Sequence, residues 1–334
     1  MLHRISVKIN HKDKTIKGDK TMAKYVFGVD IGGTTVKLGL FTVEGELQDK
    51  WEIPTRVDEG GKYILEDIAA SLEAKLVEKS ISKSDVAGVG MGVPGPVKAD
   101  GTVLRCVNLG WGIFNVAEEM TRLTGLTAKV GNDANMAALG EMWQGGGKGY
   151  KNIVMVTLGT GVGGGIIIDG KMLSGVNGAG GEIGHIRVNE EESETCGCGL
   201  KGCLEQYTSA TGIVRMANIA INNSERPSSL RNVQYISAKE VFDAAKNGDE
   251  LACELVENHG KCLGTALAQI ACVVDPEVFV IGGGVSKAGS IITDTTAKYF
   301  REYAFHACRK TKFALATLGN DAGIYGGACA VLEA

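Results

Sequence analysis

The stretch "VFGVDIGGTTVKLGLF" at residues 26–41 aligns without gaps on "IVMVTLGTGVGGGIII" at residues 153–168, and Asp30 then falls on Thr157. Each copy has the pattern of a β-strand, a tight turn of glycine and threonine, and a second strand, because turn residues separate two runs rich in β-branched side chains. A strand hairpin that recurs once in each half of the chain predicts two similar α/β domains that face each other.

The composition is typical of a soluble globular protein and argues against two classes of partner. The 334 residues are enough for two domains of ordinary size or one large one, and the net charge of −4 is unlike that of a dedicated nucleic-acid binder, which is usually basic. The longest apolar run, residues 153–168, contains five glycines and is shorter than the roughly 20 residues of a spanning helix. The N-terminus also lacks the apolar core of a signal peptide. We therefore expect a cytoplasmic protein that has neither nucleic acid nor a membrane as a partner.

Residues 1–21 hold six lysines or arginines and few apolar side chains. This pattern predicts a disordered arm, or a start codon upstream of the true start at Met22. The segment is too short for a helix-turn-helix domain.

Several helices are predicted from the spacing of apolar residues and from their caps. Apolar residues four apart predict a helix within residues 61–80, and another helix is expected to begin near Asp133 or Asn135, which are both good cap residues. A long amphipathic helix is predicted to end before Pro276, and the chain is expected to finish with a helix of small residues.

Two glycine-rich turns have the chemistry of phosphate-binding loops. "DIGGTT" at residues 30–35 and "LGTGVGG" at residues 158–164 offer backbone N–H groups and threonine hydroxyls that can surround phosphate oxygens. Asp30 is placed to hold a metal ion, directly or through water, and Mg²⁺ suits a nucleotide because it needs only one or two carboxylates. The second turn also matches G-x-G-x-x-G, but a dinucleotide-binding fold needs a helix next, and "GIIIDG" predicts a strand. The sequence contains no P-loop motif.

Three of the nine cysteines crowd into eight positions near one of the five histidines, in "GEIGHIRVNEEESETCGCGLKGCLEQ" at residues 181–206. His185, Cys196, Cys198 and Cys203 make a Cys₃His set, which is typical of a closed structural zinc site. Two cysteines alone would also fit a redox pair, whereas the third cysteine, the histidine and the intervening glycines favour a metal. The other six cysteines are scattered and are predicted to be core or surface residues.

Five motifs, in order, resemble those of the ROK family (repressors, open reading frames, kinases): "VDIGGTTVKLGLF", "VGNDANMAALGE", "TLGTGVGGGII", "GAGGEIGH" and "CGCGLKGCLE". The resemblance runs from about residue 25 to the end and is greatest to the bacterial glucokinases of that family. It implies the actin/hexokinase-like (ribonuclease H-like) fold, in which two α/β domains enclose an active site in the cleft between them. The small domain would be residues 22–131 with a C-terminal helix within 318–334, and the large domain, with the zinc site, residues 132–317.

The resemblance also implies roles for individual residues. Asp133 in "GNDAN" would be the general base that takes the proton of a sugar hydroxyl, and its place at a helix N-terminus favours the charged form. If zinc holds one ring nitrogen of His185, the other is free to contact the sugar, so the metal would fix the sugar-binding loop. The sequence that begins at Asn108 is "NLGWG", and it departs from the "NLPGW" spacing of many relatives. The sugar would bind Asn108, Asn132, Asp133, Glu182, His185 and Glu205. The phosphates of ATP would lie against Gly32, Gly33, Thr34, Thr35, Gly159, Thr160, Gly161 and Gly163, and the adenosine near Gly283 and Gly284.

The implied activity is the phosphorylation of D-glucose to glucose 6-phosphate by ATP and Mg²⁺, in a homodimer or homotetramer. One alternative is a kinase for another sugar, such as fructose, mannose or N-acetylmannosamine, because relatives with these substrates share the motifs. The other is a sugar-sensing transcriptional regulator of the same family. A regulator carries an N-terminal DNA-binding domain of several dozen residues, and this chain has only residues 1–21 in that place.

Overall fold

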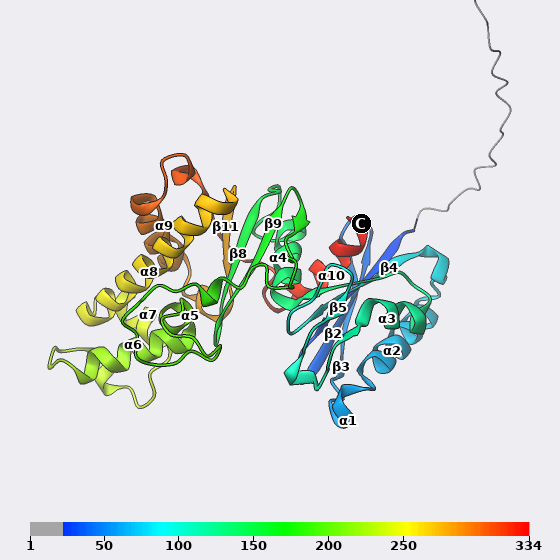
Figure 1. Cartoon of the computed structure of the whole chain (residues 1–334), viewed down its shortest axis with the longest axis horizontal. Coiled ribbons are helices and arrows are strands. Elements are labelled where there is room, and N and C mark those ends of the chain that lie inside the picture. The colour runs from blue at the N-terminus through cyan, green and yellow to red at the C-terminus, as the bar shows by residue number, and fades with distance from the viewer. Residues whose placement is uncertain (1–22, 334) are drawn as a thin grey trace, which may run out of the picture.

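The structure, a computed structural model, describes residues 23–333 and contains two five-stranded sheets (Figure 1). In the first sheet the strand order is β3-β2-β1-β4-β7. The pairs β1–β2 and β2–β3 are antiparallel, whereas β1–β4 and β4–β7 are parallel. The strands are β1 (Tyr25–Ile31), β2 (Thr35–Thr42), β3 (Leu47–Pro54), β4 (Val86–Val93) and β7 (Ala128–Asn132).

The second sheet repeats this plan with the order β10-β9-β8-β11-β12. Its first three strands are again antiparallel, and β8–β11 and β11–β12 are parallel. The hairpins β1–β2 and β8–β9 therefore occupy equivalent places, which confirms the repeat predicted from the sequence. The strands are β8 (Ile153–Leu158), β9 (Val162–Ile168), β10 (Lys171–Met172), β11 (Val278–Gly282) and β12 (Lys312–Leu315). A small ribbon, β5 (Thr102–Val103) with β6 (Phe114–Asn115), lies in the segment after β4.

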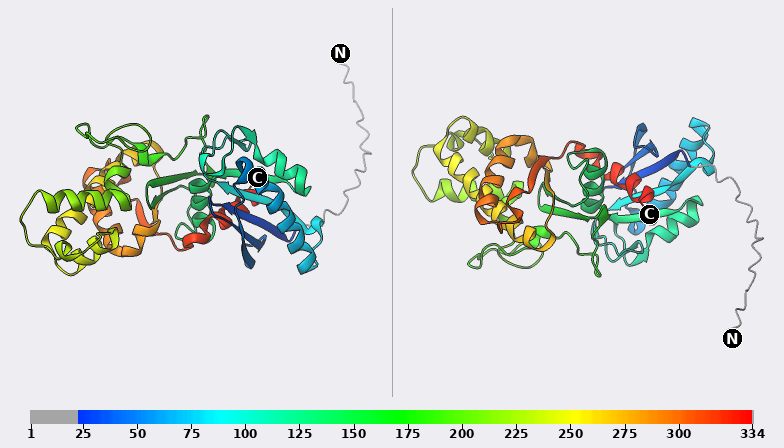
Figure 2. Two further views of the ribbon diagram at one scale, coloured as in Figure 1. Left: turned by 90° about the horizontal axis from the view of Figure 1, so that it is seen from below. Right: turned by 90° about the horizontal axis from the view of Figure 1, so that it is seen from above.

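Helices cover the outer face of each sheet, and two more lie between the sheets (Figures 1 and 2). Helix α4 packs on β8 and β9, α10 packs on β1 and β4, and the two helices contact each other along their length. The order through the molecule is thus sheet, α10, α4, sheet. The helices are α1 (Asp58–Gly61), α2 (Ile64–Lys79), α3 (Val116–Thr124), α4 (Asp133–Gln144), α5 (Glu205–Thr208), α6 (Ala210–Asn222), α7 (Ala238–Lys246), α8 (Glu250–Val274), α9 (Ser290–Tyr303) and α10 (Ala322–Leu332).

The helix limits follow from local signals in the sequence. Helix α2 buries its apolar residues against the first sheet, as the spacing of four predicted. Helix α8 begins after Asp249, whose side chain accepts the N–H of Ala252, and ends at Asp275, where φ is +43°, directly before Pro276. Asn132 caps α4 by accepting the N–H groups of Ala134 and Asn135, so the helix begins at Asp133.

The arm expected at residues 1–21 lies outside the described residues. Within residues 23–333, no helix is both long enough and apolar enough to cross a bilayer.

Helix α10 approaches its neighbours so closely that a side chain at Gly326 has no room. A Cβ atom built there would lie 1.7 Å from the carbonyl oxygen of Met136 on α4. We expect Gly326→Ala to lower the free energy of unfolding by about 1–3 kcal/mol, because the helices would have to separate. Gly112→Ala is the matched control, since nothing lies within 4 Å of its Cβ position. Urea denaturation of both variants tests this, and equal stabilities would contradict it.

Candidate active site

Two carboxyl groups lie at the same edge of the first sheet. Asp30 pairs with Gly92 of β4 near the end of β1, and Asp133 follows the last residue of β7. A Cβ atom built on Gly92 would lie 3.6 Å from both Asp30 Oδ1 and Asp133 Cα. The carboxyl ends of parallel strands therefore bring together residues that are about 100 positions apart in the sequence, at the edge where ligands bind in open α/β sheets.

Burial shifts the titration of both groups. It raises the pKa of Asp30 to about 6, helped by the charge of Asp133 and opposed by Lys37. It also raises the pKa of Asp133, against the opposing effect of the Ala134 N–H, which donates to Asp133 Oδ1 at 2.8 Å. A divalent cation at this edge would favour the charged form of both carboxyls.

The first glycine turn, Gly32–Thr35, is held in place by hydrogen bonds on one side. The N–H of Gly32 donates to Thr35 O at 3.0 Å, and the hydroxyl of Thr55 donates to Gly32 O at 2.7 Å. Gly33, Thr34 and Thr35 are exposed, and nothing lies within 4 Å of the Cβ position of Gly33. The turn is therefore fixed on one side and open to a ligand on the other.

The second glycine turn, Gly159–Gly163, is held by the start of α6. The N–H of Ala210 donates to Gly159 O at 2.8 Å, and the hydroxyl of Thr211 donates to Thr160 O at 2.6 Å. On its other side the turn meets Glu205, whose Oε2 lies 2.6 Å from a Cβ atom built on Gly161. A glycine is therefore needed at position 161 for the carboxylate to reach the turn.

The loop that carries Glu182 and His185 is fastened to the beginning of α4. The buried side chain of Asn135 donates from Nδ2 to Gly180 O at 3.3 Å. Because Asn135 lies two residues after Asp133, it sets the position of this loop relative to the Asp133 carboxyl. Sequence reasoning treated Asn135 only as a candidate cap and missed this role, which depends on a contact between distant segments.

The cluster of one histidine and three cysteines fits a zinc ion. Its four ligand atoms lie within 4.8 Å of one another, with Cys198 Sγ 3.6 Å from Cys203 Sγ and Cys196 Sγ 3.9 Å from His185 Nδ1. A tetrahedral ion with Zn–S bonds of about 2.3 Å would place two sulfurs about 3.8 Å apart. The donor set and the spacing therefore both suit a closed four-coordinate site.

The two ring nitrogens of His185 face different groups. Nδ1 faces the sulfurs and lies 3.9 Å from Glu205 Oε1, whereas Nε2 lies 4.0 Å from Glu182 Oε2. Glu205 Oε1 in turn accepts from Cys196 Sγ at 2.9 Å. The structure thus brings together Glu182, His185 and Glu205 and leaves Nε2 directed away from the cysteines.

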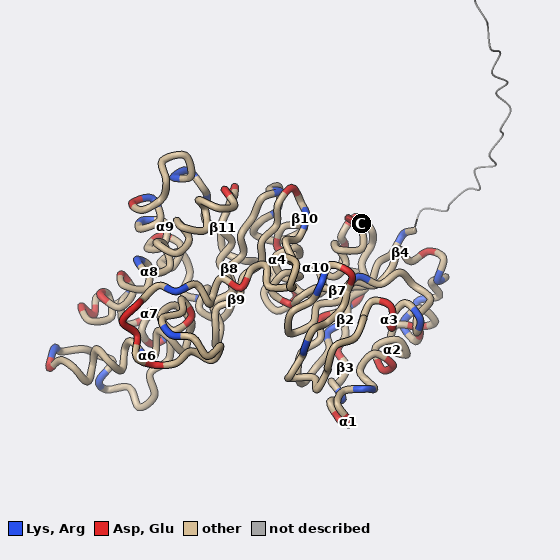
Figure 3. Tube along the Cα trace, in the orientation of Figure 1, with Lys and Arg blue, Asp and Glu red and all other residues tan. Residues whose placement is uncertain are grey.

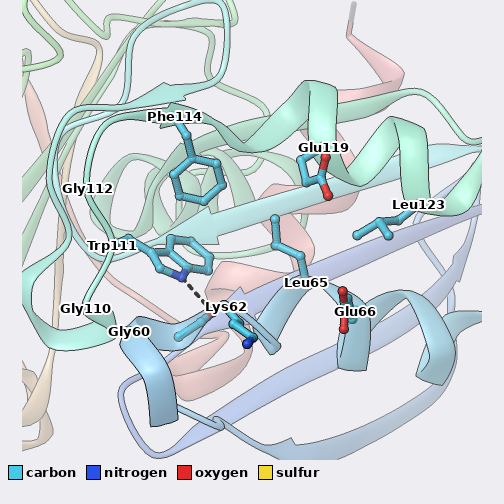
Figure 4. Close-up of a pocket in the computed structure, with 11 residues that line it drawn as sticks. Gly60, Lys62, Leu65, Glu66, Gly110, Trp111, Gly112, Phe114, Glu119 and Leu123 are labelled. Atoms are coloured by element: carbon cyan, nitrogen blue, oxygen red, sulfur yellow. Dashed lines mark hydrogen bonds between the residues drawn. The ribbon is translucent and has the colours of Figure 1, made fainter.

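Asn108 lies on a 3₁₀ turn, Val107–Leu109, in the segment after β4, and it is exposed. Trp111 anchors this segment by donating from Nε1 to Gly61 O at 2.9 Å (Figure 4). Burial raises the pKa of the Cys106 thiol, two residues before Asn108; the backbone of Leu109 opposes this shift, and the charge of Asp133 adds a smaller increase. The pocket of about 350 Å³ drawn in Figure 4 lies behind this segment, and none of the predicted site residues lines it.

A second pocket of about 350 Å³ adjoins the glycine turn after β11. Gly284 lines it, whereas Gly283 lies beside it with φ at +81° and its Cβ position 2.5 Å from Leu158 O. Sequence reasoning missed the remaining wall, because α7 carries no motif of its own and meets the turn after β11 only in the folded chain. That wall includes Ala210, Lys239, Phe242, Val285, Lys287 and Ala288.

The structure has the features of a phosphotransferase with an alcohol acceptor. These features are paired sheets of the same order, two glycine turns and a carboxyl group at a helix start. Residues 26–334 match the ROK family, to which the chain belongs. It is 45% identical to a glucokinase of Halalkalibacterium halodurans, over 91% of this chain and 94% of that protein. It is 33% identical to an N-acetylgalactosamine kinase of Shewanella, over 90% and 95% of the two chains. A ROK family glucokinase of Streptomyces griseus, solved in complex with glucose and AMPPNP, is similar with a TM-score of 0.68 and 33% identity, over 91% and 98% of the two chains.

We expect Asp30→Asn to stabilise the fold at pH 8 but not at acidic pH. The pKa of Asp30 is about 6 in the folded state and about 4 in an unfolded chain, so the folded state binds the proton more tightly. The stability of the wild type therefore falls as the pH rises from about 4 to about 6, and asparagine removes this loss. The expected gain at pH 8 is on the order of 2 kcal/mol.

Urea denaturation of both proteins at pH 4 and pH 8 measures this difference. Other titrating groups, including the cysteine cluster, are common to both proteins and largely cancel. The same difference in free energy of unfolding at both pH values would contradict the assignment of a buried, destabilised charge to Asp30.

Proposed function

We propose that this protein transfers the γ-phosphoryl group of ATP to the 6-hydroxyl of D-glucose. The observation that carries the proposal is the 45% identity to a bacterial glucokinase over nearly the whole of both chains. The site geometry supports it, since carboxyl groups, glycine turns and a separate pocket supply a base, phosphate contacts and room for a nucleoside.

Asp133 is the proposed general base. Its carboxyl lies at the edge of the first sheet, and its raised pKa makes it a better proton acceptor than an ordinary aspartate. As the phosphoryl group arrives, the sugar hydroxyl gives its proton to this carboxylate. Asn132, which caps α4 and donates from Nδ2 to Gly95 O at 3.1 Å, keeps the start of the helix in place.

The two glycine turns are proposed to hold the phosphates from opposite sides. Gly32–Thr35 belongs to the first sheet and Gly159–Gly163 to the second, and the pocket around Gly284 would take the nucleoside. Asp30 would hold Mg²⁺, directly or through water, and the ion would neutralise charge on the phosphates. Phe242 offers an apolar surface to a base, and Lys239 and Lys287 lie at the same pocket.

The sugar is proposed to lie between Asn132 and Asp133 on one side and Glu182, His185 and Glu205 on the other, with Asn108 at the margin. Zinc held by His185 Nδ1 and the three cysteines would fix the loop geometry, since four protein ligands leave no open position for catalysis. His185 Nε2 then donates to a sugar hydroxyl, and Glu182 and Glu205 accept from others.

We expect Asp133→Asn to lower kcat for glucose by at least about 10²-fold, because asparagine cannot accept the proton. A coupled ADP-release assay with MgATP across a panel of sugars, including glucose, mannose, fructose and N-acetylated hexosamines, gives kcat/KM for both proteins. A higher value for another sugar would change the substrate and leave the mechanism. A mutant with wild-type kcat would refute the assignment of the base.

Replacing a cluster cysteine is expected to release zinc and weaken sugar binding. For Cys198→Ser we expect less than one zinc ion per chain by metal analysis and a glucose KM raised at least about 10-fold, as the loss of an orienting ligand typically costs. Cys253→Ser, at an exposed cysteine outside the cluster, is the matched control. A zinc-free Cys198→Ser protein with full activity would show that the metal has no part in holding the sugar loop.

The protein is further proposed to act as a homodimer or homotetramer on small molecules alone. In Figure 3, basic and acidic positions are interspersed over both halves of the molecule. Such a surface does not favour the phosphate backbone of DNA.

A further inference from the structure

The chain passes between the two halves of the structure at two places. One is the end of β7, where Asn132 and Asp133 lead into α4, and the other is the segment of residues 316–321 between β12 and α10. Two bodies joined at two points rotate about the line through those points. That line runs from Asp133 to the second crossing. The carboxyl group of a single residue, Glu141, accepts hydrogen bonds from the second crossing.

Glu141 lies on α4, two turns after Asp133, and its side chain is completely buried. Its carboxylate accepts the N–H of Gly146 at 2.7 Å, that of Thr317 at 3.0 Å and that of Leu318 at 2.8 Å. A buried carboxylate is costly unless it is fully hydrogen-bonded, and these three donors satisfy it. Two of the three belong to the second crossing, which is thereby fixed to α4.

The surroundings of Glu141 are shaped to receive it. A Cβ atom built on Gly145 would lie 2.0 Å from Glu141 Oε2, and one built on Gly146 would lie 2.2 Å from Leu315 O. Glycines at both positions let the end of α4, the carboxylate and the end of β12 come together.

The far end of the second crossing is fastened to the other half. Lys37 of β2 donates to Asn320 O at 3.0 Å, and Lys50 of β3 pairs with Asp321 at 2.7 Å. Between the two attachments only the region around Gly319 remains, and its φ is +56°. This glycine can absorb a backbone rotation that other residues would resist.

We propose that Glu141 is a positioning residue for phosphoryl transfer, because it fixes the second crossing to α4 and makes α4 the hinge axis. Asp133 then lies on the axis, so closure moves the glycine turns towards each other while the base stays in place. The hinge itself is a property of the fold. The proposal rests on the proposed function only for the claim that closure assists phosphoryl transfer.

Glu141→Gln tests this with the full-length, zinc-loaded protein, because glutamine keeps the shape but turns an amide NH₂ towards N–H donors. We expect amide hydrogen exchange at Thr317 and Leu318 to rise about 10-fold or more, and kcat for the best sugar to fall about 10- to 100-fold, as small misplacements do. The Kd of adenosine should stay within about twofold, since the nucleoside pocket lies wholly in one half, whereas the phosphates of ATP are proposed to reach both halves. Glu254→Gln, at an exposed ion pair on α8, is the matched control.

If Glu141→Gln does not fold, Leu318→Pro removes one of the three N–H donors and leaves the carboxylate intact. Leu318 has φ −81°, close to the value of proline. Small-angle X-ray scattering with glucose and AMPPNP should then show a weaker contraction than for the wild type. Unchanged exchange and contraction in a folded variant would overturn the hinge, even if the sugar-kinase assay had failed, and a selective loss of adenosine binding would also contradict it.

Discussion

The rest of the structure depends on the contact of α4 with α10 between the two sheets. Helix α10 reaches β1 and β4 backbone to backbone, with a Cβ position at Gly28 only 1.8 Å from Ile324 O, and it meets α4 as closely at Gly326. Only small residues allow this spacing, which explains the glycines and alanines of the C-terminal segment. The contact fixes the spacing of the two sheets where α4 and α10 meet, and it brings the carboxyl edge of the first sheet towards the glycine turn of the second.

This arrangement places two carboxyl groups where they do not stabilise the fold. Asp30 and Asp133 lie close together at the edge of the first sheet, and desolvation raises the pKa of each. Such a pair is costly to stability and is typical of a functional site. Glu141 shows the contrasting case on the same helix, because three backbone donors satisfy its carboxylate. The start of α4 therefore carries a carboxyl group that is proposed to react, and the last turns carry a carboxylate that stabilises the structure.

The sequence was sufficient for the features that are local or repeated. The hairpin repeat predicted the paired sheets, the apolar spacing predicted α2, and Asp133 with Asn135 predicted a helix start at this point, although the residue that caps α4 is Asn132. The spacing of His185, Cys196, Cys198 and Cys203 predicted a cluster that the fold does bring together.

Contacts between distant segments could not be predicted in this way. Phe242 and Lys287 share a pocket only because α7 and the turn after β11 meet in space. Asn135 and Glu141 looked like ordinary helix residues, since their partners at Gly180 and Thr317 lie 45 and 176 positions away. Polar side chains that serve backbone groups far along the chain leave no pattern in a single sequence.

In the proposed mechanism, the acceptor hydroxyl of the sugar meets Asp133 between the two sheets. A crystal structure with glucose and AMPPNP, with data also collected at the zinc edge, tests it most directly. We expect the glucose 6-hydroxyl within hydrogen-bond distance of the Asp133 carboxylate, phosphates at both glycine turns, and one anomalous peak among His185 and the three cysteines. A 6-hydroxyl directed away from Asp133, with the nucleotide bound elsewhere than the pocket at Gly284, would contradict it.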